Sequence, residues 1–243
     1  MSVVENIQNV RAKIAAAAEK SGRTAEDVLL LAVSKTKPVE LIGEAVQAGC
    51  LSLGENKVQE IMEKYEPMME YAPEGERIHW HLIGHLQTNK VKYIIDKVCM
   101  IHSVDSLKLA EEIDKRAAQH GLTMDILIQV NSAMEESKFG ITTEETGAMI
   151  ESILENCPNI RIRGLMCIAP FEDNPDDARE YFAEVKKLYD KYGRLANPRI
   201  DFKYLSMGMS NDFEVAIEEG STLIRVGTSI FGVRDYSKKM GGN

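Results

Sequence analysis

The chain has 243 residues, of which 44% are hydrophobic and 28% are charged, and its formal net charge is -9. This length suits one large α/β domain or two smaller ones, and the acidic balance excludes a general electrostatic attraction to nucleic acid or anionic membranes. No apolar run approaches the roughly 20 residues of a membrane span, and the N-terminus lacks the apolar region of a signal peptide. Four cysteines without a CxxC pair are typical of reduced thiols in a cytoplasmic protein.

Predicted strands and helices alternate along the chain. Short apolar runs predict strands at 28–33, 51–54, 79–83, 98–104, 124–130, 160–168, 202–206 and 222–227. Capping residues and helical periodicity predict helices at 1–20, 39–48, 56–69, 89–97, 106–120, 143–155, 175–192 and 212–219. Strict alternation with nearly continuous apolar strands is typical of a parallel sheet with helices outside it.

Eight such units in 243 residues predict an α/β protein with a single (β/α)8 TIM-type barrel, in one domain over residues 1–243. The first predicted helix is then an extra N-terminal helix that covers the last gap of the barrel. An open, doubly wound sheet is the alternative. No GxGxxG follows the first strand, which disfavours the dinucleotide-binding version of that sheet.

A lysine follows the first strand. The uncharged run at 28–33 stops at Ser34 and Lys35, and Pro38 then suits the opening of the next helix. Because α/β folds place their chemistry at the carboxyl ends of their strands, Lys35 is a candidate functional residue. The alternative is an ordinary solvated lysine at a strand end.

Two small-residue segments follow the last two strands, Ser206-Met-Gly-Met-Ser210 and Arg225-Val-Gly-Thr-Ser229. In (β/α)8 enzymes a phosphate commonly lies between these loops, and glycine lets the backbone approach it closely. Glycine and serine can also simply terminate strands. A lysine that faces such a phosphate site suggests a phosphorylated aldehyde bound as a Schiff base.

Three further side chains are candidates for this site. Arg225 shares a strand face with Gly227, so it points at the ligand if that face lines the barrel, or else forms an ordinary salt bridge. His79 and His81 share one face of the third strand, which suggests a metal ion, but no nearby acidic residue or cysteine completes a ligand set. We therefore predict no metal site.

Several blocks along most of the chain resemble the pyridoxal phosphate homeostasis proteins of the YggS/PROSC family. They include Ala32-Val-Ser-Lys-Thr-Lys-Pro38, Gly54-Glu-Asn56, Trp80-His81, Ile83-Gly84, His102-Ser-Val-Asp105, Arg163-Gly-Leu-Met166, Ser206-Met-Gly-Met-Ser210 and Arg225-Val-Gly-Thr228. The resemblance implies a barrel similar to the N-terminal domain of alanine racemases, with pyridoxal 5′-phosphate (PLP) as cofactor. One departure is Lys57, which stands where many members have an aromatic residue and changes the expected pocket wall.

The resemblance also implies roles for individual residues. Lys35 matches the Schiff-base lysine, and Arg225 matches the arginine that faces the pyridine nitrogen. The matching phosphate-binding positions are Ser206, Gly227 and Thr228, and the positions around the cofactor are Asn56, His81 and Met207. Lys37 could favour the neutral amine of Lys35 by like-charge repulsion, but the sequence does not fix its direction.

The resemblance therefore implies that the chain is a PLP-binding protein that acts in intracellular vitamin B6 and amino-acid homeostasis. We expect it to have no efficient reaction of its own. An arginine cannot accept the proton of the ring nitrogen, and racemisation needs a second acid/base group, which the racemases take from a second domain. The alternatives are a single-domain PLP-dependent amino-acid racemase and a cofactor-free Schiff-base aldolase. The expected partners are PLP and apo forms of PLP-dependent enzymes, with neither nucleic acid nor membrane. The sequence leaves the oligomeric state open between a monomer and a weak dimer.

Overall fold

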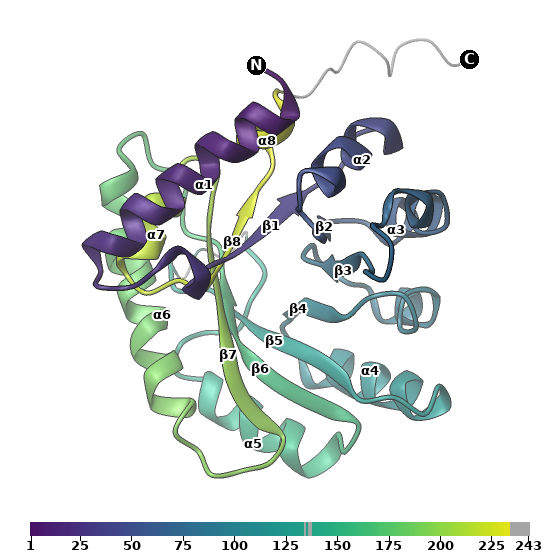
Figure 1. Cartoon of the computed structure of the whole chain (residues 1–243). Helices are drawn as coiled ribbons and strands as arrows, with labels where there is room; N and C mark the ends of the chain where they lie inside the picture. The colour runs from purple at the N-terminus through teal and green to yellow at the C-terminus, as the bar shows by residue number, and fades with distance from the viewer. Residues whose placement is uncertain (134, 136–137, 234–243) are drawn as a thin grey trace.

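The computed structural model describes residues 1–133, 135 and 138–233, and its strands form one closed parallel barrel (Figure 1). The strands are β1 (Leu29–Val33), β2 (Ser52–Glu55), β3 (His79–Leu82), β4 (Met100–Val104), β5 (Met124–Val130), β6 (Ile160–Cys167), β7 (Ile200–Met209) and β8 (Leu223–Val226). Pairing of β1 with β8, from Leu29 opposite Leu223 to Ala32 opposite Val226, closes the barrel. The predicted barrel is confirmed, and the open sheet is excluded.

Helices surround the strands. They are α1 (Val3–Lys20), α2 (Val39–Gln47), α3 (Val58–Lys64), α4 (Leu107–Gln119), α5 (Thr146–Asn156), α6 (Arg179–Tyr192), α7 (Phe213–Glu218) and α8 (Thr228–Phe231). Short 3₁₀ helices lie at Ala25–Asp27, Pro67–Tyr71, Thr88–Tyr93 and Pro175–Ala178. No helix in the described ranges combines the length and the apolar composition that crossing a membrane requires.

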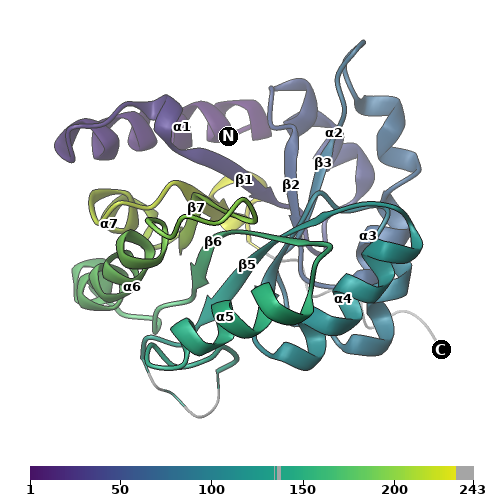
Figure 2. The same ribbon diagram turned by 90° about the horizontal axis from the view of Figure 1, so that it is seen from below.

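Helix α1 covers the last gap, as predicted. Ser2 caps it in a reciprocal capping box with Glu5. One apolar stripe of the helix is buried, made of Val3, Ile7, Val10, Ile14, Ala17 and Ala18. Through this stripe α1 lies against α7 and α8, which brings the first residues of the chain beside the last helix (Figure 1). Figure 2 shows α1 and α7 on the same side of the barrel.

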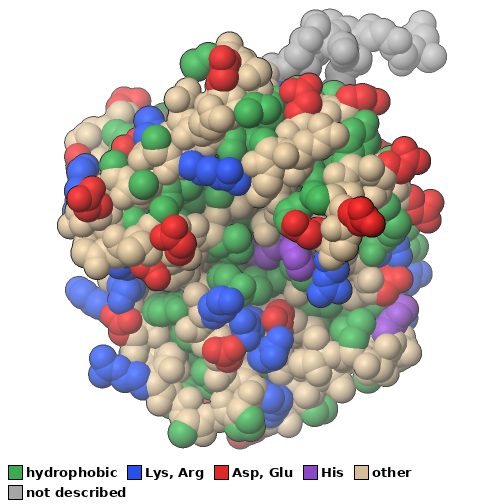
Figure 3. All heavy atoms as spheres, in the orientation of Figure 1, with side chains coloured by type: hydrophobic (Ala, Val, Ile, Leu, Met, Phe, Trp, Pro, Cys, Tyr) green, Lys and Arg blue, Asp and Glu red, His purple; other side chains and the backbone are tan. Residues whose placement is uncertain are grey.

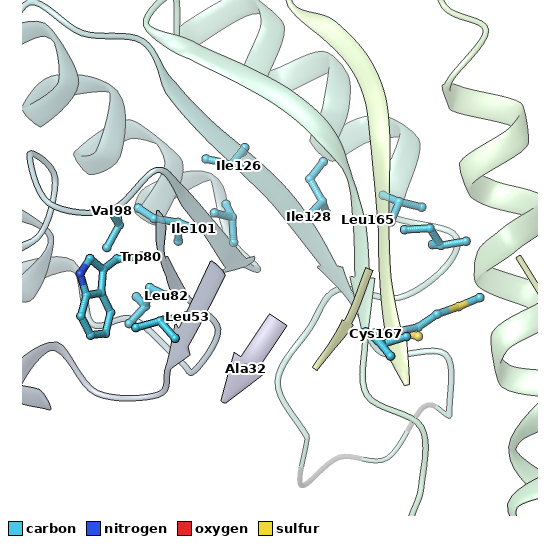
Figure 4. Close-up of a cluster of buried hydrophobic side chains, with 14 of the residues drawn as sticks. Ala32, Leu53, Trp80, Leu82, Val98, Ile101, Ile126, Ile128, Leu165 and Cys167 are labelled. Carbon is cyan, nitrogen blue, oxygen red and sulfur yellow. The ribbon is translucent and has the colours of Figure 1, made fainter. Parts of the chain in front are cut away.

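Two apolar layers follow from the alternation of side chains along each strand. The outer layer lies between strands and helices, and Figure 4 shows part of it, from Ala32 on β1 round to Cys167 on β6. Inside the barrel, Leu31 and Val33 of β1 pack with Ile83 and Leu223. Acidic and basic side chains are interspersed over the face drawn in Figure 3, so the net charge of -9 is not gathered into one patch there.

The structure corrects three predicted elements. Strand β7 continues to Met209, so residues 207–209 belong to the strand and Ser206 is not its last residue. The predicted helix at 89–97 is a 3₁₀ turn, Thr88–Tyr93, in a segment where β-branched and aromatic residues lower helix propensity. The short helix α8 after β8 was not predicted; four residues are too few for a helical periodicity to show in sequence.

Candidate functional site at the barrel mouth

Lys35 stands in a tight turn directly after β1. Leu31 and Val33 face the barrel interior and Ala32 faces the outer layer, and the half-buried Lys35 follows at the carboxyl end of the strand, where the mouth of the barrel lies. The next residue, Thr36, has φ 62, a left-handed conformation that is unusual for a β-branched residue. The amide of Lys37 then donates to the Ser34 carbonyl at 3.1 Å and closes the turn.

The side chain of Lys37 binds the end of α8 and the residues that follow it. Its ammonium donates to the carbonyls of Phe231, Gly232 and Val233 at 2.9, 3.1 and 3.3 Å. These carbonyls lie at the carboxyl end of α8, where a cation satisfies unpaired acceptors and complements the helix dipole. Lys37 therefore ties the β1 turn to the segment that follows β8.

A group of donors lies between the ends of β7 and β8. The hydroxyl of Ser210 accepts hydrogen bonds from the backbone amides of Gly227 and Ser229, at 3.3 and 3.4 Å. A side chain at position 227 would crowd Val33, because a Cβ there would lie 3.3 Å from the Val33 carbonyl oxygen. The exposed Thr228 begins α8 between the two amides. Converging backbone amides and hydroxyls of this kind suit a phosphate group.

Ser206 does not belong to this donor group. Its side chain is completely buried inside the barrel, where its hydroxyl accepts from Arg225 Nη1 at 2.7 Å. The position of Ser206 within β7 turns it inward, and Ser210, the first residue after the strand, carries the hydroxyl beside the amides. The expected phosphate role of Ser206 stays a prediction.

Arg225 is buried in the barrel and held by three hydrogen bonds. Besides the Ser206 hydroxyl, its guanidinium donates to the Ser206 carbonyl at 2.8 Å and to the Cys167 carbonyl at 2.9 Å. These bonds use three of its five N–H donors. Burial lowers the pKa of Arg225, which nevertheless remains a cation because an arginine starts from so high a value.

A chain of hydrogen bonds runs from Arg225 across the barrel interior. His102 Nδ1 lies 3.2 Å from the Ser206 hydroxyl, and His102 Nε2 lies 2.9 Å from His81 Nδ1. His81 Nε2 in turn lies 3.4 Å from Cys99 Sγ, and this thiol donates to the Trp80 carbonyl at 3.3 Å. Each member of the chain thus contacts the next.

The arginine fixes the direction of this chain. Burial lowers the pKa of His81 to about 3 and that of His102 well below the ordinary value, so each imidazole is neutral and carries one N–H. Arg225 can only donate to Ser206, which leaves the serine proton for His102 Nδ1. The single N–H of His102 is then on Nε2 and donates to His81, whose own N–H faces Cys99. These tautomers are inferred from the bonding pattern.

Two further predicted residues lie in different surroundings. Asn56 follows β2, and its Oδ1 is buried with no hydrogen-bond partner among the described residues. An acceptor left in this state suits a ligand that brings a donor. The side chain of Met207 lies in the outer apolar layer, so only its backbone can face the mouth. Its expected place around a cofactor stays a prediction, one that its backbone would have to meet.

The predicted site residues thus lie in two regions of the barrel. Lys35, Asn56, Gly227 and Thr228 follow strand ends, whereas His81, Ser206 and Arg225 lie inside the barrel. Within the predicted small-residue segment, the hydroxyl at the amides belongs to its last residue, Ser210, which the sequence does not single out; the end of β7 is the signal that identifies it. Among the residues that the structure describes, no cluster of three histidine, cysteine or acidic side chains could hold a metal ion.

Comparisons with known proteins agree with this architecture. Residues 6–235 match the family model described as alanine racemase, N-terminal domain. The chain is 45% identical over 236 residues to the pyridoxal phosphate homeostasis protein of Aquifex aeolicus, covering 97% of this chain and 100% of the relative. Among solved structures, PipY of Synechococcus elongatus with PLP bound superimposes with a TM-score of 0.80 at 32% identity, covering 95% of this chain and 100% of PipY. An alanine racemase of Clostridium difficile shares the fold alone, with a TM-score of 0.66 at 14% identity over 95% of this chain and 57% of the racemase.

Proposed function

The chain belongs to the pyridoxal phosphate homeostasis protein family, and from this we propose that it binds PLP on Lys35 and acts in PLP and amino-acid homeostasis. The observation that carries the proposal is the similarity, over 95% of the chain, to a PipY structure that contains PLP. The geometry of the mouth agrees with it, since a lysine and a group of phosphate-type donors follow strands β1, β7 and β8 of one barrel.

The residues at the mouth fit two groups of PLP, its phosphate and its aldehyde. The amides of Gly227 and Ser229, with the hydroxyls of Ser210 and Thr228, would hold the phosphate, which as an anion is a stronger acceptor than the serine hydroxyl now bound there. Lys35 would hold the aldehyde through its neutral amine. The unpartnered Oδ1 of Asn56 would accept from a donor of the ligand.

Arg225 would set the character of the bound ring. PLP supplies an electron sink, and it does so best when its ring nitrogen carries a proton that an acidic partner provides. Arg225 donates hydrogen bonds and has no acceptor atom, so it cannot stabilise a protonated nitrogen. The chain through Ser206 and His102 holds the guanidinium in place. We therefore propose binding and release of PLP without an efficient reaction at an amino acid.

A racemase is the main alternative. Racemisation needs two acid/base groups on opposite faces of the substrate. The neutral His81 and His102 do not supply the second one, because their ring nitrogens are occupied by each other, Ser206 and Cys99. Incubation with single-enantiomer amino acids and chiral analysis tests this alternative; turnover well above that of free PLP would establish a racemase.

The absorption spectrum of the purified protein tests the proposal. Titration with PLP should produce a visible band that Lys35→Ala abolishes, whereas a cofactor-free aldolase would show no such band. Mixing the loaded protein with the apo form of a PLP-dependent enzyme should restore that enzyme's activity, and deletion of the gene should alter cellular PLP. No transfer and no change in PLP would refute the homeostasis role. We place the protein in the cytoplasm, consistent with its four free thiols, Cys50, Cys99, Cys157 and Cys167.

A further inference from the structure

A buried lysine lies beneath the turn that carries Lys35. Lys64 is on α3 and is only 7% exposed. Its ammonium donates to the Ser34 carbonyl at 2.9 Å, to Glu55 Oε1 at 2.7 Å and to Glu60 Oε2 at 2.9 Å. All three of its N–H groups are thereby satisfied.

The two carboxylates also reach the turn. Glu55, on β2, is completely buried and accepts from the Ser34 hydroxyl at 2.7 Å. Glu60, on α3, accepts from the backbone amide of Thr36 at 2.6 Å. Lys64, Glu55 and Glu60 therefore form a clasp that holds the residue before Lys35 and the residue after it.

The backbone of the turn needs such support. A threonine at φ 62 is strained, because its branched Cβ crowds the backbone in the left-handed region. Strained conformations persist where surrounding contacts fix them, and they concentrate at functional sites. The hydrogen bond from the Thr36 backbone amide to Glu60 fixes the left-handed conformation of Thr36.

Burying the charged groups of the clasp costs desolvation free energy, so the clasp is a poor source of stability. Burial raises the pKa of Glu55 even though Lys64 and Ser34 favour its charged form, and Glu55 Oε2 has no hydrogen-bond partner in the described part of the chain. For Glu60, burial opposes ionisation too, but the bonds from Lys64 and Thr36 outweigh it and lower its pKa. Apolar side chains often replace buried ion clusters without loss of stability, so the clasp points to a task other than stability.

We propose that Lys64, Glu55 and Glu60 are positioning residues for Lys35, an inference that rests on the proposed binding of PLP. By fixing Ser34 and Thr36 before the ligand arrives, the clasp presents the Lys35 side chain toward the mouth in a single backbone conformation. Binding then avoids the entropy loss of ordering the turn.

Glu60→Leu is the most informative substitution. It leaves Lys64 and Glu55 as a balanced pair and removes the acceptor of the Thr36 amide. Glu63→Leu is the matched control, since it makes the same change at an exposed position of the same helix. Glu60→Gln keeps an acceptor oxygen and should restore function, and Thr36→Gly, added to Glu60→Leu, removes the steric strain of the turn.

Two measurements separate positioning from a general structural role. The dissociation constant for PLP, from the visible band, should rise about tenfold in Glu60→Leu, the size expected for one charge-assisted hydrogen bond. It should stay near the wild-type value in Glu63→Leu and Glu60→Gln, and recover partly in the Thr36→Gly double variant. In the PLP-free protein, hydrogen exchange of the Thr36 amide should accelerate in Glu60→Leu alone among the single variants.

The outcomes distinguish this inference from the proposed function. If wild-type protein produces no PLP band, the proposed function fails, while amide exchange still reports on the clasp. If wild-type protein binds PLP and Glu60→Leu binds it equally well, or if Glu63→Leu weakens binding to the same degree, the positioning role is refuted. Should Glu60→Leu not fold, Glu60→Ala, which removes the acceptor without adding apolar bulk, carries the same expectations.

Discussion

His81 and His102 lie edge to face inside the barrel, with His81 Nδ1 2.9 Å from His102 Nε2 and their ring planes at 80°. This contact links the two ends of a chain of polar side chains inside the barrel. On one side His102 reaches Arg225 through Ser206, and on the other side His81 reaches Cys99. Since the arginine can only donate, the protonation state of each histidine bears on how firmly the guanidinium is held.

The histidine pair predicts a loss of stability in acid. Both imidazoles are neutral in the fold, with the pKa of His81 lowered to about 3, whereas in the unfolded chain each titrates near its ordinary value of about 6.5. Between these values the unfolded state binds more protons, so the contribution is complete above about pH 6.5 and is lost as the pH falls. Each histidine should contribute a slope of up to about 1.4 kcal/mol per pH unit.

Urea unfolding at several pH values between neutral and mildly acidic checks this slope. His81→Phe should flatten it by the share of one histidine, while His120→Gln, at an exposed position, is the control. Glu55 acts with the opposite sign, because burial raises its carboxyl pKa, but it is common to all three proteins and cancels in the comparison. Equal slopes in wild type and His81→Phe would show that the buried imidazole does not titrate as inferred.

The two serines near the end of β7 should have separable effects. Ser210→Ala removes the hydroxyl at the amides of Gly227 and Ser229, so it should weaken PLP binding several-fold and hardly change stability. Ser206→Ala removes the hydroxyl that Arg225 Nη1 and His102 Nδ1 share, so His102 Nδ1 loses its buried partner, which should lower the free energy of unfolding by about 1–3 kcal/mol. PLP titration and urea unfolding of both variants decide. A Ser206→Ala protein of wild-type stability that has lost PLP would support the predicted phosphate role of Ser206 and contradict this assignment to Ser210.

The fold could be predicted from sequence because its signals are local. Alternating apolar strands and capped helices imply a parallel barrel, and strand ends identify Lys35, Asn56 and Gly227. Ser206 and Ser210 illustrate the limit of such signals. Whether a serine faces the interior or the mouth depends on where β7 ends, and strand ends are the least certain part of a prediction.

Contacts between distant segments could not be predicted. Lys64 looks like an ordinary helical lysine with a partner at Glu60, four residues away, and nothing local indicates its bonds to Ser34 and Glu55. Likewise, His102 lies between His81 and Ser206 in the fold, but nothing local in the sequence distinguishes it from a structural or solvated histidine. These distant residues meet because the barrel closes. The sequence implies the closure but does not give the register in which neighbouring strands pair.

Lys37 should affect stability more than cofactor attachment. Lys37→Met removes three donors from the carboxyl end of α8, and we expect a loss of about 1–2 kcal/mol in the free energy of unfolding. The visible PLP band should remain, because Lys35 is the proposed point of attachment. Spectra of Lys37→Met and Lys35→Ala, loaded side by side with PLP, check this. A Lys37→Met protein that loses the band as fully as Lys35→Ala would make Lys37 the anchor.

Gly208 should be the glycine of β7 on which the site depends. Its φ is 92, and a Cβ there would lie 2.6 Å from Ala216 Cβ and 2.9 Å from Phe213 Cα, so a side chain must push α7 away from the strand. Gly208→Ala should combine backbone strain with this clash and destabilise the protein by about 2–4 kcal/mol. It should also shift Ser210, two residues on, and weaken PLP binding.

Gly75 provides the matched control, because its φ of 79 is also left-handed but nothing lies within 4 Å of a Cβ at that position. Gly75→Ala should therefore lose only the conformational contribution, about 1 kcal/mol, and bind PLP as wild type does. Thermal unfolding and PLP titration of the two variants separate strain from crowding. Equal losses in both would mean that the backbone conformation, and not the contact of β7 with α7, accounts for the glycine at position 208.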